Sequence, residues 1–171
     1  MARVLVVDDQ ELMRESMELT LRRADHDVVT AASGREGLDL LARGRFDVVI
    51  SDLKMAGLDG LALLERVKAR WPDVEVVLIT AFGTIDVAVA AMKSGAFDFL
   101  QKPFKADQLT VVVERALERR RLRSENEALR TQARSQALPH LVGRSAAIRQ
   151  VREQIERVAR SAATVLIHGE S

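Results

Sequence analysis

Five short apolar runs alternate with amphipathic segments along the first 104 residues of the chain. The runs are VLVVD, DVVTA, DVVISD, EVVLIT and AFDFL, which begin at residues 4, 27, 47, 75 and 96. The segments between them carry apolar residues at helical spacing over 10–23, from about 33, over 61–70 and over 84–94. Strands alternating with helices favour βα units and a parallel sheet that is covered on both faces. The sequence therefore predicts a doubly wound α/β domain over residues 1–104.

Composition and charge limit the class of protein. The chain has 171 residues, 47% of them hydrophobic, and no cysteine, so we expect neither disulfides nor thiolate metal sites. The first apolar run is too short for a signal peptide, and no stretch approaches the ~20 apolar residues of a membrane span. We expect a cytoplasmic protein without membrane contact. Residues 1–104 carry a net charge of −4 and residues 105–171 carry +5, which indicates two modules with different roles.

The second module begins with a helical pattern that runs without a breaker from residue 105 to about residue 135. Leu122, Asn126 and Leu129 occupy d, a and d positions of a heptad, with charged residues around them. We expect residues 105–135 to form one long helix, within a linker over 105–138, and its later half to pair with a second copy as a short parallel coiled coil. The alternative is a solvated helix that pairs with nothing.

Polar residues stand at the ends of four of the five predicted strands. Asp8 and Asp9 end the first strand, Asp52 the third, Thr80 the fourth and Lys102 the fifth. Because the carboxyl ends of parallel strands share one edge of the sheet, we expect these groups to converge. Neighbouring carboxylates repel one another, and Mg²⁺ would relieve that repulsion. Asp52 could then act as a nucleophile toward phosphorus, while Lys102 and Thr80 bind phosphoryl oxygens.

Each of these residues also has a simpler structural explanation. Asp8 and Asp9 could cap the helix that follows, and Asp52 could start a turn. Thr80 could be an ordinary strand end, and Lys102 a solvated surface lysine. Complementary chemistry at four strand ends together is what favours a phosphoryl site over these separate explanations.

Segments around these residues resemble the signature segments of bacterial response-regulator receiver domains. They read VLVVDD, DVVISDLKM, VVLITAFG and FDFLQKPF, and the resemblance covers residues 3–104. It implies a flavodoxin-like sheet of strand order 2-1-3-4-5, with Asp52 as the phosphoacceptor and a sensor histidine kinase as the donor. It also implies Mg²⁺ ligands from Asp8 or Asp9, Asp52 and the backbone carbonyl of Lys54.

The same resemblance assigns further roles and shows two departures. Thr80 and Phe99 match the family's switch hydroxyl and switch aromatic residue, and Lys102 matches its site lysine. The Lys102–Pro103 bond matches a bond that is usually cis in the family. Ala56 stands where the family usually has proline, which loosens that loop, and Phe99 lacks the hydroxyl that many relatives carry.

Residues 139–171 form the third predicted segment, which begins at Pro139 and contains a helix over 145–160. Over 164–171 we expect a strand that enters a glycine-containing turn and that is not stable without partner strands. Residues 141–171 are similar to the start of the AAA+ ATPase domain of NtrC-type, sigma-54-dependent activators. There Gly169-Glu170-Ser171 would open a P-loop, whose lysine would come later, so we expect no complete nucleotide site and no ATPase activity in this chain. The resemblance implies a parent protein that works with sigma-54 RNA polymerase and DNA.

The leading interpretation is a phosphoacceptor module of a two-component transcription activator, not an enzyme, apart from slow self-dephosphorylation. An aspartate-based phosphatase is one alternative, but Asp8-Asp9-Gln10 does not supply its D-x-D-x-[TV] run. A second alternative is DNA binding by the helix around Arg119–Arg123, although glutamates interrupt its positive charge. His26, His140 and His168 show no metal-ligand spacing and are interpreted as structural or surface residues.

Overall fold

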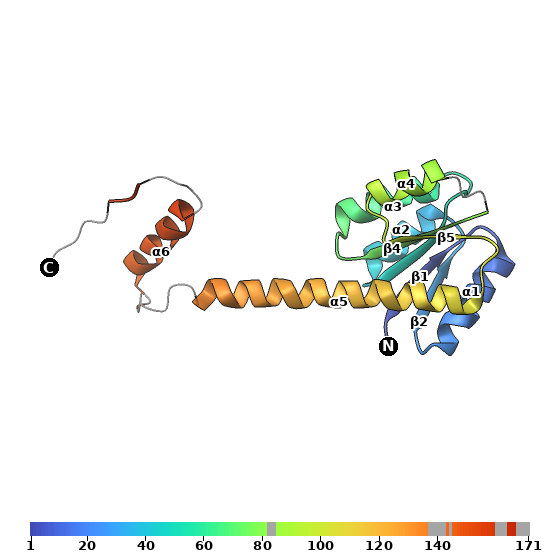
Figure 1. Cartoon of the computed structure of the whole chain (residues 1–171), viewed down its shortest axis with the longest axis horizontal. Helices are drawn as coiled ribbons and strands as arrows, with labels where there is room; N and C mark the ends of the chain where they lie inside the picture. The colour runs from blue at the N-terminus through green and yellow to red at the C-terminus, as the bar shows by residue number, and fades with distance from the viewer. Residues whose placement is uncertain (82–84, 137–142, 144, 160–163, 167–171) are drawn as a thin grey trace. The chain divides into compact units, whose positions relative to one another are not determined.

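The computed structural model describes residues 1–81, 85–136, 143, 145–159 and 164–166 (Figure 1). The chain divides into two compact units, Met1–Glu125 and Asn126–Ser171. Among the sequence predictions, Pro139, His140 and His168 lie outside the described residues, as does the Gly169-Glu170-Ser171 turn.

The first unit is built on a five-stranded, all-parallel sheet. Its strands are β1 (Arg3–Val7), β2 (Asp27–Ala31), β3 (Val48–Asp52), β4 (Glu75–Thr80) and β5 (Asp98–Gln101). Their order is β2-β1-β3-β4-β5, which confirms the flavodoxin-like topology that the resemblance implied. Val7 lies opposite both Ala31 and Ser51, so the carboxyl ends of β2, β1 and β3 are level.

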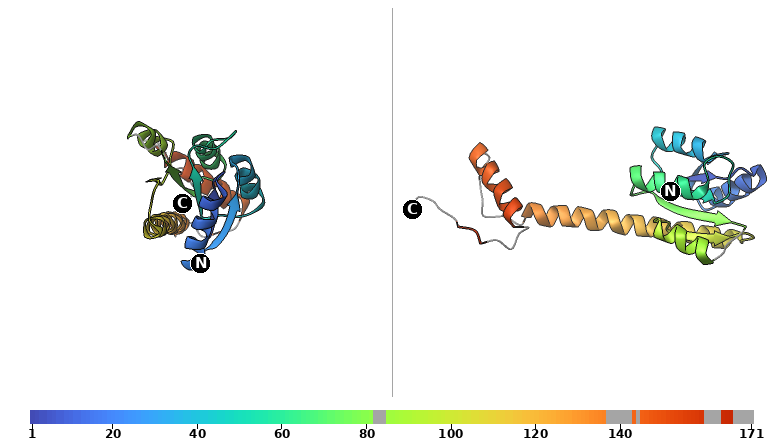
Figure 2. Two further views of the ribbon diagram at one scale, coloured as in Figure 1. Left: turned by 90° about the vertical axis from the view of Figure 1, so that its right-hand side faces the viewer. Right: turned by 90° about the horizontal axis from the view of Figure 1, so that it is seen from above.

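Helices cover both faces of this sheet. The chain contains α1 (Glu11–Arg23), α2 (Gly34–Arg43), α3 (Gly60–Arg70), α4 (Ile85–Lys93), α5 (Ala106–Gln136) and α6 (Ala146–Val158). One apolar cluster packs β-strand side chains against α2, α3 and α4, and another packs them against α1 and the first turns of α5. Figure 1 shows these two layers, and the left view of Figure 2 looks along α5 beside the sheet.

The two strands β3 and β4 are buried throughout, whereas the edge strands β2 and β5 are only partly buried. Every residue of β3 and β4 is buried, including Ser51, Asp52, Glu75 and Thr80. Runs of β-branched residues fit this environment, since both faces of a parallel sheet lie in the core. The polar residues at the strand ends are therefore the exceptions that need a chemical explanation.

Most predicted elements lie within two residues of their observed bounds, and one does not form as predicted. The strand expected over 164–171 is missing from its described part, because residues 164–166 carry no strand pairing. Val165 and Leu166 are 55% and 92% exposed, as expected for a segment without a partner strand. The long helix predicted over 105–135 is confirmed as α5.

None of the helices in the described ranges combines the length and the apolar character that crossing a membrane requires.

Candidate functional site

Asp8 and Asp52 lie side by side at the carboxyl ends of β1 and β3. Asp8 directly follows Val7, which pairs with Ser51, the residue before Asp52. Asp8 is fully buried and Asp52 is 6% exposed. Two carboxylates in a nearly dry environment require compensation by cations or hydrogen bonds.

Lys102 supplies that compensation from the end of β5. Its Nζ lies 2.7 Å from Asp52 Oδ1 and 2.9 Å from Asp8 Oδ2, and its side chain is 11% exposed. The main-chain N–H of Lys102 donates to the Thr80 carbonyl at 2.7 Å, which fixes the residue beside β4. Burial alone would lower the pKa of Lys102, but hydrogen bonds to Asp52 and Asp8 and their charges outweigh it and raise the pKa. Lys102 is therefore held as an ammonium.

The second oxygen of each carboxylate accepts a backbone hydrogen bond. The Gln10 N–H donates to Asp8 Oδ1 at 2.9 Å, and the Lys54 N–H donates to Asp52 Oδ2 at 3.0 Å. Both are local turns in which an aspartate binds the N–H two residues later. The helix-capping alternative is wrong for Asp8 and Asp9, because the N-cap of α1 is Gln10 and carries no side-chain cap hydrogen bond.

The loop after Asp52 depends on two glycines. A Cβ on Gly60 would lie 2.3 Å from the Asp52 carbonyl oxygen, so only glycine allows α3 to start this close to the site. Gly57 has a φ of +79°, a left-handed conformation that glycine adopts without strain. Asp59 caps α3 by accepting a hydrogen bond from the Ala62 N–H at 2.8 Å. The loop is thus fixed at its helix end, while Ala56 replaces the family's usual proline.

Thr80 and Phe99 lie on neighbouring strands beside this centre. Thr80 ends β4 and is 1% exposed, and the residue before it, Ile79, pairs with Asp52. Phe99 pairs with Leu78 and packs, partly buried, against the cluster under α2–α4. The Lys102–Pro103 peptide bond is cis, as the resemblance implied.

The donor set fits a divalent cation with few protein ligands. Two buried carboxylates facing one ammonium leave an excess negative charge, and Mg²⁺ takes few protein oxygens and keeps several waters. Over the described ranges, however, no three carboxylate, imidazole or thiolate side chains are grouped so that they could hold a metal ion. Asp9 is exposed, whereas Asp8 and Asp52 are buried. The roles of Asp8, Asp9 and the Lys54 carbonyl as ligands stay predictions.

Two residues at this site were not found from the sequence. Arg14 on α1 donates from Nη1 to the Asp8 carbonyl at 2.8 Å, and the buried Ser51 hydroxyl donates to the Asp52 carbonyl at 2.9 Å. Arg14 lies in the first turn of α1, six residues after Asp8. Only the predicted start of this helix could have indicated that the Arg14 side chain contacts the Asp8 carbonyl.

The residues predicted to pair in a coiled coil lie on α5. Leu122 and Leu129 are 53% and 64% exposed, and Asn126 is also exposed. Around them, most arginines of the DNA-binding alternative contact carboxylates: Arg119 and Arg123 lie 3.5 and 3.7 Å from Glu75 Oε1. Arg121 lies 3.6 Å from Glu125.

Comparison with known protein families identifies the family of this domain. The family model for the response regulator receiver domain matches residues 4–114. The chain belongs to the response regulator receiver domain family. The matched residues include all of the sheet except Arg3, the first residue of β1, together with Asp8, Asp52, Thr80 and Lys102.

The similarity to individual relatives and solved structures extends beyond the receiver domain to nearly the whole chain. The C4-dicarboxylate transport transcriptional regulatory protein DctD of Rhizobium meliloti is 39% identical over 170 residues, which cover 98% of this chain and 37% of DctD. The chain thus spans about a third of the length of the curated relatives it matches. NtrX from Brucella abortus, solved with ATP, is 41% identical with a TM-score of 0.73, over 92% of this chain and 34% of NtrX. The beryllofluoride-activated NtrC4 receiver domain dimer is 35% identical with a TM-score of 0.68, over 70% of this chain and 99% of that one.

Proposed function

We propose that this receiver domain accepts a phosphoryl group on Asp52 from a sensor histidine kinase. The observation that carries the proposal is one lysine ammonium shared by two buried carboxylates at the strand ends. A purely structural ion pair would need one carboxylate, whereas a second carboxylate adds a desolvation cost without a partner of its own. That excess charge is suited to an incoming metal ion and phosphoryl group.

The chain's own residues would position and neutralise the transferred group. A carboxylate oxygen of Asp52 forms the bond to phosphorus, and the bond from phosphorus to the donor's imidazole nitrogen breaks, with its electron pair left on that nitrogen. Lys102 donates to a phosphoryl oxygen and Thr80 to another. Mg²⁺, held by Asp8 or Asp9, Asp52 and the Lys54 carbonyl, would neutralise further oxygens when bound. Slow hydrolysis of the acyl phosphate returns Asp52 to its starting state.

The readout would be a local two-state change. A phosphoryl group adds roughly −1.5 to −2 charges and strong hydrogen-bond acceptors. Thr80 moves toward these acceptors, and Phe99 fills the space that Thr80 leaves, which alters the surface of α4 and β5. The burial of Thr80 supports this proposal, because a buried side chain that moves leaves a space behind. Phe99 is partly buried on the neighbouring strand and could fill that space.

Dimerisation through α5 would carry the signal onward. Leu122, Asn126 and Leu129 form an exposed stripe with heptad spacing, typical of a helix that pairs with a second copy. The similar NtrC4 receiver domain is a dimer in its beryllofluoride-activated form. In the parent protein, residues 139–171 would begin a sigma-54 activator ATPase that acts with RNA polymerase on DNA, and the dimer would control it.

The test is transfer of a phosphoryl group from acetyl phosphate with Mg²⁺, followed by intact-mass and peptide mass spectrometry. We expect one acid-labile phosphoryl group on the peptide that contains Asp52, and none on Asp52→Asn. Asp39→Asn, an exposed aspartate on α2, is the matched control and should be modified like the parent. Modification of Asp52→Asn to the same extent would overturn the proposal.

A further inference from the structure

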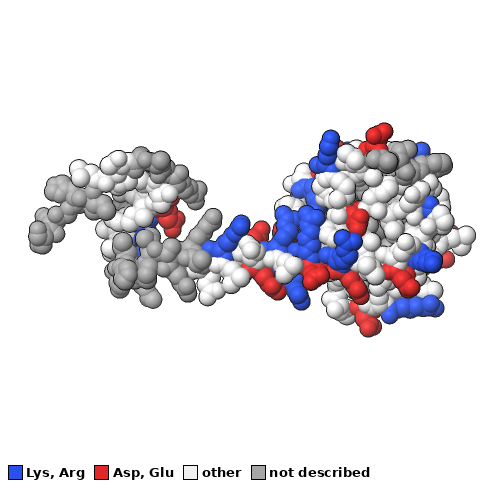
Figure 3. All heavy atoms as spheres, viewed as in Figure 1, with Lys and Arg blue, Asp and Glu red and all other residues white. Residues whose placement is uncertain are grey.

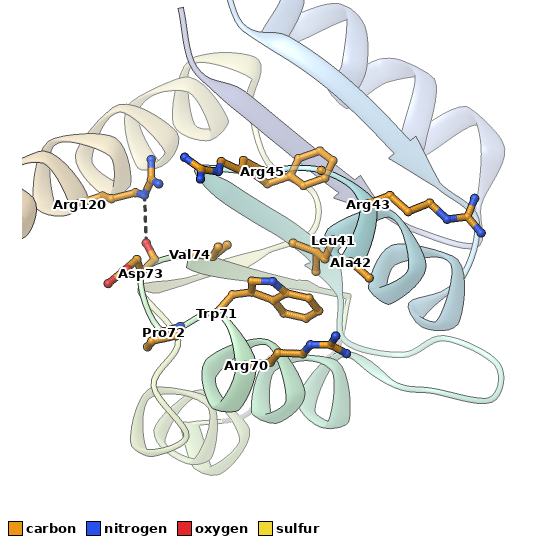
Figure 4. Close-up of a pocket in the computed structure, with 12 residues that line it drawn as sticks. Leu41, Ala42, Arg43, Arg45, Arg70, Trp71, Pro72, Asp73, Val74 and Arg120 are labelled. Carbon is orange, nitrogen blue, oxygen red and sulfur yellow. Dashed lines mark hydrogen bonds between the residues drawn. The ribbon is translucent and has the colours of Figure 1, made fainter.

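A hollow lies at the amino-terminal edge of the sheet, opposite the edge that holds Asp8 and Asp52. It has a volume of about 620 Å³ and is formed where α2 and α3 end and β3 and β4 begin. Figure 4 shows its labelled side chains, with Trp71 at the centre and Arg45, Arg70 and Arg120 around it. Pockets of about 300–1,000 Å³ accommodate small organic ligands, so the hollow is large enough for one.

The lining of this hollow is strongly positive. Arg43, Arg45, Arg70 and Arg120 contribute four guanidinium groups, and Asp73 contributes one carboxylate. Figure 3 shows Lys and Arg side chains gathered along the edge of the receiver domain near α5. Across the described ranges, Arg43, Arg45 and Arg70 make no ion pair with a carboxylate, so three of the four charges are not neutralised by the protein.

Helix ends explain only part of this cluster. Arg43 and Arg70 are the last residues of α2 and α3, where basic side chains stabilise the partial negative charge of the helix. Arg45 lies beyond α2, and Arg120 reaches the hollow from α5. Helix-end stabilisation therefore accounts for two of the four guanidinium groups and leaves Arg45 and Arg120 unexplained. Guanidinium groups bind phosphates through paired, parallel hydrogen bonds.

The floor of the hollow is apolar and aromatic. Leu41, Phe46 and Val74 are buried beneath it, and Trp71 is half-buried with the Arg70 guanidinium 5.0 Å from its ring. Figure 4 shows the exposed Arg43 and Arg45 side chains on opposite sides of the hollow, so the cations surround this floor. Beside an apolar floor the local dielectric is lower than on an open surface, which strengthens the attraction between cations and an anion.

Arg120 links the hollow to α5. Its Nε donates to the Asp73 carbonyl at 3.1 Å, and the same guanidinium binds the Asp47 carboxylate. An anion that contacts Arg120 would therefore act on the residues that hold α5 against the sheet.

We propose that this arginine-lined hollow is a binding site for small anions with two or more linked phosphates. Linked phosphates match the several separated guanidinium groups, whereas a single phosphate can contact only one or two of them. The source is either inorganic polyphosphate or a nucleoside polyphosphate, which share this chemistry. The site is separate from Asp52 and Lys102, since it lies at the other edge of the sheet.

Calorimetric titration of the 171-residue chain with sodium triphosphate tests the proposal, with EDTA present and ionic strength held constant. We expect saturable binding that Arg45→Ala/Arg70→Ala weakens by roughly tenfold or more. Arg22→Ala/Arg23→Ala on α1, which removes the same charge elsewhere, should leave the affinity unchanged. The fluorescence of Trp71, the single tryptophan, gives a second readout in the parent and the α1 variant.

A parallel titration with ATP, which carries the same number of linked phosphates, distinguishes the two sources. Equal affinity for triphosphate and ATP would indicate that the linked phosphates alone are bound, and tighter binding of ATP would indicate added contacts of the base with the Trp71 edge. The proposal is overturned if neither anion binds more tightly than sulfate at the same ionic strength. It is also overturned if both double variants lose affinity to the same extent, because the effect would then be one of net charge alone.

Discussion

At the scale of single residues, Lys102 is the positive charge that compensates the carboxylates of the proposed phosphoacceptor site. Its ammonium, with a side chain 11% exposed, is shared by Asp8 and Asp52. Removing one partner of a buried ion pair costs about 3–5 kcal/mol, because the remaining charge stays buried without compensation. Here two carboxylates would be left, so the cost should be visible in global stability.

We predict that Lys102→Ala lowers the free energy of unfolding by about 3 kcal/mol in metal-free buffer. Urea denaturation monitored by circular dichroism measures this change. Added Mg²⁺ should stabilise the variant more than the parent, because it supplies the missing positive charge beside Asp8 and Asp52. Lys105→Ala removes an exposed lysine nearby and should change stability little. Equal losses in the two variants would contradict the account.

His26 provides a pH-dependent contribution at the same scale. Neither ring nitrogen has a hydrogen-bond partner among the described residues, and both are buried. Burial lowers the pKa of His26, and the N-terminal ammonium lowers it further, against the opposing charges of Glu114 and Asp25. The folded state therefore prefers the neutral ring.

Because the folded-state pKa of His26 lies below its unfolded value of about 6.5, protonation favours unfolding. The stability that the neutral ring contributes is present above about pH 6.5 and is lost as the pH falls below that value. We predict that His26→Leu reduces the slope of unfolding free energy against pH between about 6.5 and 5, measured by denaturation at each pH. An unchanged slope would show that His26 does not titrate in this way.

At the scale of elements, charged contacts fix the part of α5 that follows the sheet. Glu75, at the start of β4, is fully buried and lies 3.2 Å from Lys68, with Arg119 and Arg123 at longer distances. Burial lowers the pKa of Lys68, and the hydrogen bond and charge of Glu75 partly offset this effect. The Arg119 guanidinium also lies 5.4 Å from the Phe97 ring. These contacts hold α5 at the amino-terminal edge of the sheet.

We predict that Glu75→Gln lowers the free energy of unfolding by about 3 kcal/mol, chiefly because Lys68 is left buried without its carboxylate. It should also speed amide hydrogen exchange in α5 around Arg119 and Arg123, measured by mass spectrometry. Glu65→Gln, on the exposed side of α3, is the control. Unchanged exchange in α5 would show that these ion pairs do not hold the helix.

Some of these features were predictable from the sequence, for identifiable reasons. Apolar runs that end in Asp52 and Thr80 fix both the strands and the edge where their last residues lie. The sequence could not show that Lys102 bridges two carboxylates 94 and 50 residues away, because that depends on side-chain placement. The same holds for Glu75, which from the sequence is an ordinary first residue of a strand. Only the structure shows that Lys68 and the arginines of α5 surround its carboxylate.

At the scale of the whole molecule, the proposed function assigns self-association to the exposed leucines of α5. We predict that Leu122→Glu weakens self-association by roughly tenfold or more, because it places a charge at a d position. Sedimentation velocity over a range of concentrations measures this effect. Leu19→Glu on α1 is the matched control, since Leu19 and Leu122 are both 53% exposed. Equal weakening by both substitutions would place the dimer contact elsewhere.

The central claim is that the state of Asp52 controls this association. Light scattering of the chain with and without beryllofluoride and Mg²⁺ tests it most directly, because beryllofluoride stands in for the phosphoryl group. The account predicts that beryllofluoride changes the mass or hydrodynamic radius of the parent and leaves Asp52→Asn unchanged. The same mass and radius in every condition, or an equal change in Asp52→Asn, would contradict it.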